Sequence, residues 1–427
     1  MSAPDRKIQP VIIPVTPGNM IGAQLYHLDN RVPVYAINAG EEEIVRIDFI
    51  FRAGHIHETM PLLASSVSLM LTEGSENYSA EEINKTLDFY GAVPNQFTEK
   101  DSAGLSIAFL TKYSIKILEL CREILFRPVF PTAELEALMR KRLQWFNVSR
   151  ERVMTVASDK FFEAIFGSSH PYGRVTSAED FTRITPELLS RFHSSHYTTD
   201  DLTIIVAGRI PDEMISQLNF IFGLLPASLT RQTDNLPLPV PGKPGRITLE
   251  KKNAIQAALR IGSITIGKRH PDYHGLKIFD TILGGYFGSR LMKNIREGKG
   301  YTYGINSSVV SFELAAYKSI STEVGIEHVA ATINEIGIEI RRLQNEPVGY
   351  VELELVRNYM LGEIVRMFDG PFATTDSFRA VWEFGLDYSY YTSMANKIRT
   401  IGADEIMHIA RTYYKIEDLF EIVVGPE

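Results

Sequence analysis

The sequence predicts an α+β protein of two tandem homologous domains, each a largely antiparallel sheet packed with helices on one face. Three observations lead to this prediction: the length of the chain, a proline-rich segment near its middle, and the likeness of the segments that end its two halves. The chain has 427 residues. A single domain usually has about 100–200 residues, so we expect more than one hydrophobic core.

The proline-rich segment sets the predicted domain boundaries. Residues 226–245 contain five prolines, Pro226, Pro237, Pro239, Pro241 and Pro244. Proline lacks a backbone donor and has a fixed φ, so such a segment holds neither a helix nor a central strand. We therefore expect an N-terminal domain over residues 1–225, a linker over 226–245 and a C-terminal domain over 246–427.

The two halves end on similar segments. Residues 197–208 and 414–425 both run from a tyrosine through an Asp-Leu pair and an apolar stretch to a glycine, at a constant offset of 217. The same offset pairs apolar positions in the helix expected before each strand, namely Ile184 with Ile401, Leu189 with Ile406 and Phe192 with Ile409. A repeat of this length indicates two homologous domains rather than a solenoid.

Apolar periodicity predicts the elements of each half. In the first half we expect strands at 44–51 and 105–110 and helices at 60–71, 80–90, 111–126, 132–166 and 186–194. In the second half we expect strands near 246–251, 257–264, 303–311 and 316–322, and helices near 273–283, 327–345, 349–368 and 374–384. Strands come in adjacent pairs and helices in runs, which is typical of an α+β arrangement.

Composition and charge exclude several classes of protein. Hydrophobic residues make up 44% and charged residues 22%, as in an ordinary globular protein. The net charge is 44 − 52 = −8, which disfavours nucleic acid and anionic membrane as partners. The segment Met1–Lys7 lacks the pattern of a signal peptide, so a cytoplasmic location is expected. Cys121, the single cysteine, lies on an apolar helical segment and is expected to be a small buried hydrophobe.

Four segments carry a resemblance to a known family: 74–91, 170–173 (His-Pro-Tyr-Gly), 197–208 and 284–303. The last is the most specific, because it contains Gly-Gly-Tyr-Phe-Gly-Ser-Arg-Leu followed by an arginine and a tyrosine seven residues apart. Over nearly the whole chain the sequence resembles the pitrilysin-like peptidases, family M16. The resemblance implies a duplicated α+β fold closed like a clamshell, and zinc-dependent peptide hydrolysis in active members.

The resemblance also shows where the zinc motif is lost. The family motif His-x-x-Glu-His places two zinc ligands on one side of a helix and a glutamate that activates water. Its three positions fall on Ser65, Ser68 and Leu69, which include no good zinc donor. The distal glutamate ligand of the family falls near Leu143, Gln144 and Trp145. We therefore expect neither a metal nor another cofactor in this chain, and zinc in a partner chain.

An alternative metal site involves the segment His55-Ile56-His57-Glu58. On an extended strand it would place two imidazoles on one side, close to an inverted zinc motif, although Thr59 stands where that motif requires histidine. Gly54 and Pro61 instead mark a strand end and a turn, which favours solvated loop histidines. His193 and His196 are expected to be packing residues near the end of a helix.

Arg296 and Tyr303 are the candidate catalytic residues. In active members an arginine and a tyrosine seven residues later close over the substrate, and 303 − 296 = 7 here. The resemblance implies that the tyrosine stabilises the tetrahedral intermediate and that the arginine helps to bind substrate. A purely structural alternative is a basic helix end, a glycine turn and a strand tyrosine. The nearby Gly284, Gly285 and Gly288 favour a turn between helices over a phosphate cradle.

A candidate peptide-binding strand lies at residues 93–98. It corresponds to the edge strand of the family, to which a peptide adds through backbone hydrogen bonds, and Pro94 fits an edge position. The candidate substrate-binding residues are Asn95, Gln96 and Phe97.

Three hypotheses of function follow. The leading one is a non-catalytic subunit of a two-chain zinc peptidase, which supplies Arg296 and Tyr303 to a zinc-bearing partner chain. The partner would form a heterodimer with this chain, and self-association is left open. The second is a catalytically inert peptide-binding or scaffold protein of the same fold. The third is a self-sufficient peptidase that uses His55 and His57.

Overall fold

The structure is a computed structural model that describes residues 21–226 and 236–426. The segment Met1–Lys7 and residues 227–235 of the predicted linker lie outside these described residues. The predicted boundaries of the two domains remain predictions.

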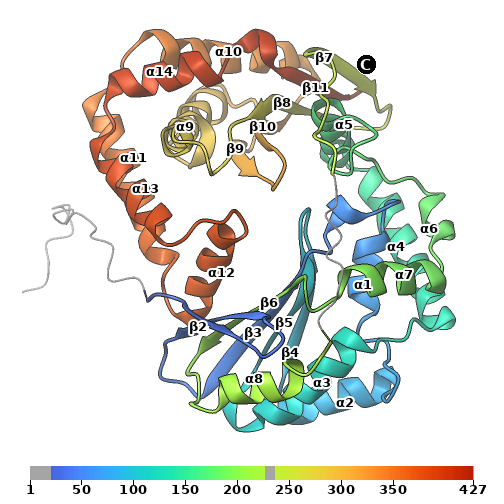
Figure 1. Cartoon of the computed structure of the whole chain (residues 1–427). Helices are drawn as coiled ribbons and strands as arrows, with labels where there is room; N and C mark the ends of the chain where they lie inside the picture. The colour runs from blue at the N-terminus through green and yellow to red at the C-terminus, as the bar shows by residue number, and fades with distance from the viewer. Residues whose placement is uncertain (1–20, 227–235, 427) are drawn as a thin grey trace, which may run out of the picture.

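The first half forms a six-stranded sheet (Figure 1). Its spatial order is β1-β2-β6-β3-β5-β4. Only β2 and β6 pair in parallel, and each remaining pair of neighbours is antiparallel. The strands are β1 (Gln24–His27), β2 (Pro33–Asn38), β3 (Ile44–Phe51), β4 (Val93–Thr98), β5 (Ala103–Leu110) and β6 (Leu202–Gly208).

The second half repeats this topology in a five-stranded sheet of order β7-β11-β8-β10-β9. The order and the strand directions match those of β2-β6-β3-β5-β4, with β7 and β11 as the parallel pair. This match is what a tandem duplication predicts. The strands are β7 (Gly245–Glu250), β8 (Ala257–Thr265), β9 (Ile305–Ser311), β10 (Ala316–Val324) and β11 (Phe420–Gly425).

Helices pack on both sheets, which confirms the predicted α+β class. The first half has α1 (Leu63–Met70), α2 (Ala80–Tyr90), α3 (Ser114–Phe126), α4 (Thr132–Arg150), α5 (Val153–Phe166), α6 (Asp180–Arg183), α7 (Pro186–His196) and α8 (Met214–Phe222). The second has α9 (Tyr273–Asp280), α10 (Val329–Asn345), α11 (Tyr350–Arg366), α12 (Pro371–Trp382), α13 (Ser389–Thr400) and α14 (Ala403–Tyr413). Two π-helices, η3 (Thr281–Gly285) and η4 (Met292–Gly298), follow α9.

Local sequence explains why α2 begins and ends where it does. The Ser79 hydroxyl accepts from the Glu82 amide, and the Glu82 carboxylate accepts from the Ser79 amide at 2.9 Å. These reciprocal bonds form a capping box, and Gly91, with φ of 62°, ends the helix in the left-handed conformation.

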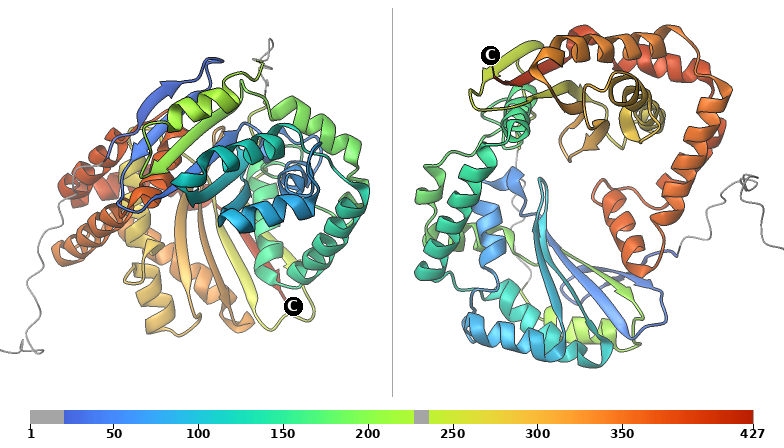
Figure 2. Two further views of the ribbon diagram at one scale, coloured as in Figure 1. Left: turned by 90° about the horizontal axis from the view of Figure 1, so that it is seen from below. Right: turned by 180° about the vertical axis from the view of Figure 1, so that it is seen from behind.

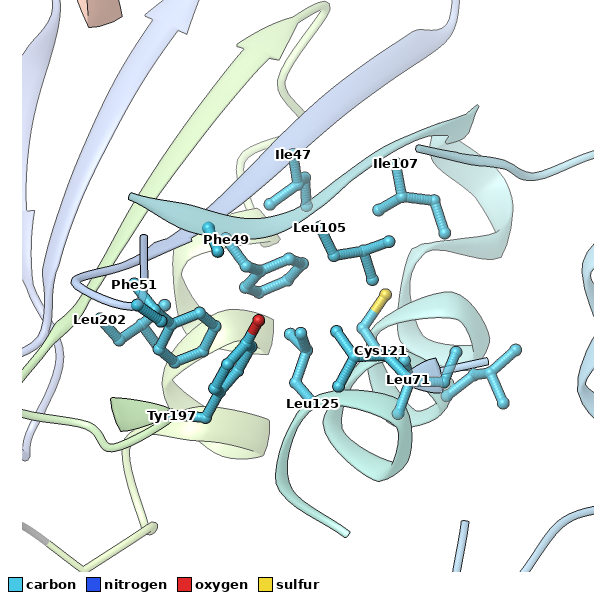
Figure 3. Packing of buried hydrophobic residues seen from close by; sticks show 14 of the residues in the cluster. Ile47, Phe49, Phe51, Leu71, Leu105, Ile107, Cys121, Leu125, Tyr197 and Leu202 are labelled. Carbon is cyan, nitrogen blue, oxygen red and sulfur yellow. The ribbon is translucent and has the colours of Figure 1, made fainter. Parts of the chain in front are cut away.

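The core of the first half lies between its sheet and its own helices (Figure 3). Phe49 and Phe51 of β3 and Leu105 of β5 point toward α3, which contributes Cys121 and Leu125. All five side chains are buried, and Cys121 packs as a small hydrophobe.

The opposite face of each sheet is covered by a helix from the other half (Figure 2). Helix α5 of the first half packs Phe161 and Ile165 against Ile422 of β11. Helix α12 of the second half packs Phe378 against Ile205 of β6. The sequence did not predict this exchange of helices, because no local pattern identifies the sheet on which a helix packs.

The prediction of a single helix over residues 132–166 is wrong, because the helix is interrupted between Arg150 and Val153. Arg152 adopts an extended conformation, with φ of −83° and ψ of 124°. The break separates α4, which packs on its own half, from α5, which packs on the other half. Neither glycine nor proline marks this position, so the sequence carried no signal for it.

Helix α5 should therefore stabilise both halves. Phe161 is fully buried. Replacing it by alanine, Phe161→Ala, should lower the free energy of unfolding by about 3–5 kcal/mol, because a large side chain is removed from a packed interface. Chemical denaturation measures this loss. Phe220→Ala on α8, where the ring is 71% exposed, is the control and should change stability little. Equal effects of the two substitutions would contradict the packing of α5.

Candidate functional site

Helix α1 carries the three positions that the sequence resemblance matches to the family zinc motif. Ser65 and Ser68 lie one turn apart, so they share a face of α1. The Leu69 side chain is 41% exposed and has no donor atom. The Ser68 hydroxyl donates to the carbonyl oxygen of Phe97 in β4 at 3.1 Å.

Arg142 of α4 donates hydrogen bonds to two serines of α1, Ser65 and Ser66. Its Nη2 donates to the Ser65 hydroxyl at 2.8 Å, and its Nη1 donates to the Ser66 hydroxyl at 2.7 Å. Burial lowers the pKa of Arg142, and the nearby Glu58 carboxylate opposes that shift. A guanidinium cation and two hydroxyls do not form a zinc site, because zinc requires thiolate, imidazole or carboxylate donors.

The residues near the predicted distal ligand do not complete such a site. Gln144 and Trp145 are exposed on α4, and Leu143 is an apolar side chain packed against the core. Within residues 21–226 and 236–426, no group of three or more His, Cys, Asp or Glu side chains is arranged to hold a metal ion.

The start of α1 is held by a tight turn. Leu62 has a φ of +74°, a left-handed conformation that costs a non-glycine residue roughly 1–2 kcal/mol. Its carbonyl oxygen accepts from the Ser65 hydroxyl at 3.1 Å and from the Ser66 hydroxyl at 2.6 Å. The two serines that contact Arg142 are thereby fixed in position.

The residues His55-Ile56-His57 form a 3₁₀ turn, η1 (His55–His57), which agrees with the expected strand end and turn and not with the extended strand of the alternative metal site. The turn directs the His55 Nδ1 to the Glu58 carboxylate at 2.9 Å. The same carboxylate oxygen accepts from the Ala64 amide of α1 at 3.0 Å. Glu58 therefore acts as an anchor for the first turn of α1, where a negative charge is favoured.

Strand β4 is the edge of the first sheet, as predicted, because it pairs only with β5 among the described strands. Asn95 is exposed on it. The Gln96 amide donates to the Thr72 hydroxyl at 2.9 Å. The Phe97 ring lies under the Arg379 guanidinium at 4.0 Å, a contact between the two halves.

Arg296 and Tyr303 lie together on the second half. The Arg296 Nε donates to the Tyr303 carbonyl at 2.9 Å, and its guanidinium lies 4.7 Å from the centre of the Phe287 ring. The Tyr303 side chain is 94% exposed. The neighbouring Thr302 hydroxyl donates to the Glu323 carbonyl at 2.8 Å, which ties the loop to β10. The loop is therefore fixed while the phenol stays accessible.

The glycines before this loop serve packing. A Cβ on Gly284 would lie 2.7 Å from the Ser307 Cβ of β9, so glycine lets η3 pack closely on that strand. Gly284 and Gly285 lie inside η3, and of the three glycines only Gly288 lies in the predicted turn between helices.

Ser65 and Tyr303 line different cavities. A cavity of about 400 Å³ contains Ser65 and Arg142, and one of about 620 Å³ contains Tyr303. A third cavity, of about 800 Å³, shares Asp159 with the first and Met154 with the second. The three cavities thus form a path along the start of α5.

Arg142 and Lys100 of the first cavity were not predicted from the sequence. The only available signal was the basic run Arg140-Lys141-Arg142 just before the predicted distal ligand, where the family has a carboxylate. The predicted packing roles of the two helix histidines hold: the His193 Nε2 lies 2.8 Å from the Leu125 carbonyl, and the His196 ring packs on Phe192.

The fold and the site together define a duplicated α+β protein that has hydroxyls and a guanidinium at the positions matched to a zinc motif. A family model described as "Peptidase M16 inactive domain" matches residues 183–360. "Uncharacterized zinc protease YmxG" from Bacillus subtilis is 24% identical over 343 residues, which cover 80% of this chain and 83% of that protein. "Non-peptidase homolog YmxG" from Helicobacter pylori is 20% identical over 85% of this chain and 84% of its own length.

Solved structures agree with these matches. A peptidase M16 inactive domain from Pseudomonas fluorescens has a TM-score of 0.80 at 21% identity, covering 95% of this chain and 98% of that chain. A protease from Helicobacter pylori has a TM-score of 0.85 at 16% identity, covering 96% and 100%. These matches confirm the resemblance to the M16 peptidases that the sequence predicted. None of the helices in the described part of the chain is long and apolar enough to cross a membrane.

His193 should make stability depend on pH. Burial lowers its pKa to about 4 from an ordinary 6.5, although the bond to the Leu125 carbonyl opposes the shift. Below pH 6.5 the unfolded chain binds this proton first. Stability should therefore fall between pH 6.5 and about 4, by at most ~1.4 kcal/mol per pH unit for one proton.

Denaturation at several pH values measures this slope. His193→Gln can still donate to the Leu125 carbonyl and should flatten the slope, whereas His27→Gln, at an exposed position, should leave it unchanged. An unchanged slope in His193→Gln would contradict the assignment.

Zinc binding should not return when the family motif alone is restored. The triple variant Ser65→His, Ser68→Glu, Leu69→His still lacks the distal carboxylate and keeps the Arg142 cation beside position 65. It should retain far less than one zinc per chain after dialysis, and so should the unmodified chain. Adding Arg142→Ala should raise the zinc content. A full zinc site in the triple variant would contradict the placement of the distal ligand near Gln144. If the unmodified chain holds zinc and loses it when His55 and His57 are replaced, the hypothesis of a peptidase that uses these histidines is favoured.

Proposed function

We propose that this chain is a non-catalytic subunit of a two-chain zinc peptidase of the M16 type. One observation carries the proposal: the positions matched to the zinc motif hold Ser65, Ser68 and Leu69, whereas Arg296 and Tyr303 lie together with the phenol exposed. The zinc ligands are absent at the matched positions while the arginine and the tyrosine are retained. This combination favours an active site formed by two chains, each of which supplies part of the catalytic residues. The zinc and the water-activating glutamate would lie on the partner chain.

In this proposal Tyr303 donates its phenolic hydrogen to the oxygen that becomes negatively charged during peptide hydrolysis. Its exposure leaves it accessible to a substrate held by another chain. Arg296 is a positioning residue, because its Nε holds the Tyr303 carbonyl and its guanidinium stacks on Phe287. The Thr302 bond to β10 fixes the other side of the loop, so the phenol approaches the substrate with little loss of conformational entropy.

The edge strand β4 would hold part of the substrate. Asn95 is exposed there, so a peptide can approach the first part of the strand. At Phe97 the Ser68 hydroxyl already uses one lone pair of the carbonyl oxygen. A carbonyl oxygen has a second lone pair, and a peptide amide can also replace the serine hydroxyl as the donor. A peptide can therefore add to β4 as an extra strand despite this contact.

The alternative is a catalytically inert protein that binds peptides or acts as a scaffold. The specific observation in its favour is Arg142, which gives the first half a cationic cavity at the position matched to the zinc site. The relatives bear both kinds of name, since one is called a zinc protease and another a non-peptidase homolog. The proposal includes a heterodimer with the zinc-bearing chain, self-association as the alternative assembly, and a cytoplasmic location.

The proposal predicts a rate effect at Tyr303 in a reconstituted pair. With a zinc-bearing M16 chain from the same genome, Tyr303→Phe should lower kcat by roughly 10²–10³, the usual cost of losing one oxyanion donor. Steady-state hydrolysis of a quenched peptide measures the rate, and size-exclusion chromatography checks that the pair still forms. Tyr350→Phe is the matched control, because its ring is 75% exposed on α11 and it loses the same oxygen. Unchanged kinetics of Tyr303→Phe in an intact pair would leave the scaffold alternative ahead.

A further inference from the structure

The cavity beside α1 has an unusual charge for this protein. We define the Arg142 pocket as the cavity of about 400 Å³ whose charged lining consists of Lys100, Arg142, Arg150, Arg174, Glu58 and Asp159, next to His55. Four permanent cations and two carboxylates give 4 − 2 = +2, whereas the whole chain has a net charge of −8. A concave, cationic cavity on an acidic protein concentrates anions.

Both carboxylates in the pocket already have partners. Glu58 accepts from His55 and from the Ala64 amide, and Asp159 pairs with Arg150 at 2.9 Å. Asp159 therefore offsets Arg150, and Glu58 is the carboxylate of the described lining that is left for Lys100, Arg142 and Arg174.

Among the described residues, three cations of the pocket donate no hydrogen bond to a carboxylate. Arg142 donates to the hydroxyls of two serines, and Arg174 donates to the Glu58 carbonyl at 3.1 Å. The Lys100 ammonium nitrogen lies 5.7 Å from the centre of the Phe162 ring, and the carboxylates that act on it, Glu58 among them, do so through space. Partly buried cations that outnumber their counterions are unfavourable, and these three share one carboxylate of the lining, Glu58, so the pocket is preorganised for an added anion.

The pocket lies next to the edge strand. Lys100 follows the last residue of β4, Thr98, by two positions. On α1, Ser65 lines the pocket, and Ser68 reaches the Phe97 carbonyl of β4. The two serines are separated by one helical turn, about 4.5 Å along the axis. A peptide that extends along β4 toward its end therefore reaches Lys100 and Arg142.

We propose that the Arg142 pocket binds a carboxylate of a peptide held along β4, and so selects acidic peptides. The inference rests on the proposed function for the presence of a peptide. Ammonium and guanidinium groups form charge-assisted bonds with carboxylates, which are the only anionic groups of an unmodified peptide. The carboxylate comes either from an Asp or Glu side chain or from the C-terminus.

The test uses the full chain and three short fluorescent peptides of equal length. One is neutral with an amidated C-terminus, the second adds a single glutamate, and the third is neutral with a free C-terminal carboxylate. Fluorescence anisotropy gives the Kd of each. A peptide with a carboxylate should bind roughly ten- to hundred-fold more tightly than the neutral amide, and rising salt should reduce the difference. The second and third peptides distinguish a side-chain carboxylate from a terminal one.

Arg142→Gln and, separately, Lys100→Met should abolish most of this preference. Lys141→Met is the matched control, because it removes one charge from an exposed position next to Arg142 on α4 and should leave the preference intact. Circular dichroism checks the fold of each variant. Equal binding of all three peptides to the unmodified chain would overturn the inference and leave peptide binding itself supported.

If none of the peptides binds, the peptide-binding part of the proposed function fails, and succinate then tests the pocket separately. Succinate should raise the unfolding temperature of the unmodified chain and not that of Arg142→Gln. No shift in the unmodified chain, or an equal shift in both proteins, would overturn the pocket as a carboxylate site.

Discussion

Each sheet of this protein has two apolar faces, and the need to cover both determines how the two halves are joined. A sheet face rich in Ile and Val is unstable in water, and the helices of one half cover only one face of its sheet. Phe161 on α5 and Phe378 on α12 fill the remaining faces from the opposite half. Because α5 and α12 pack on different sheets, the halves cannot separate without exposing both interfaces.

The exchange of helices also sets the positions of the candidate sites. It brings the turn after β4 to the hairpin between β9 and β10, where the Asp101 carboxylate accepts from the Glu313 amide at 2.8 Å. Asp101 also accepts from the Tyr172 hydroxyl of the His-Pro-Tyr-Gly segment. Arg46 of β3 makes a second link between the halves, to Asp376 of α12 at 2.6 Å. The pocket at α1 and the loop of Tyr303 therefore belong to one framework, although they line separate cavities.

Local patterns were sufficient to predict most of the elements and the duplication. The apolar pattern predicted β3 at 44–51 and a helix at 80–90, and both elements have these bounds in the structure. The sequence could not predict the break at Arg152, because its cause is the packing of α5 on a distant sheet. At His55–His57 the sequence predicted a strand end and a turn, and the structure has a 3₁₀ turn there in which His55 contacts Glu58.

The candidate site residues could be located from the sequence, whereas the residues that contact them could not. Counting from the glycine at position 74 located Ser65, Ser68 and Leu69, and the spacing of seven residues located Arg296 and Tyr303. The bonds from Arg142 to Ser65 and Ser66 join residues more than seventy positions apart, and such contacts leave no periodic signal. The carbonyl contact of Arg296 likewise depends on the path of the loop rather than on residue type.

The break between α4 and α5 has a mechanical consequence. Arg150 ends α4 and pairs with Asp159 of α5, so one ion pair crosses the break and lines the Arg142 pocket. Helix α5 is attached to the second sheet through Phe161 and Ile165. A rotation of the second half would therefore displace α5, and with it Asp159 in the wall of the pocket. By reciprocity, an occupant that stiffens this wall resists the rotation, so the angle between the halves and the occupancy of the pocket are thermodynamically linked.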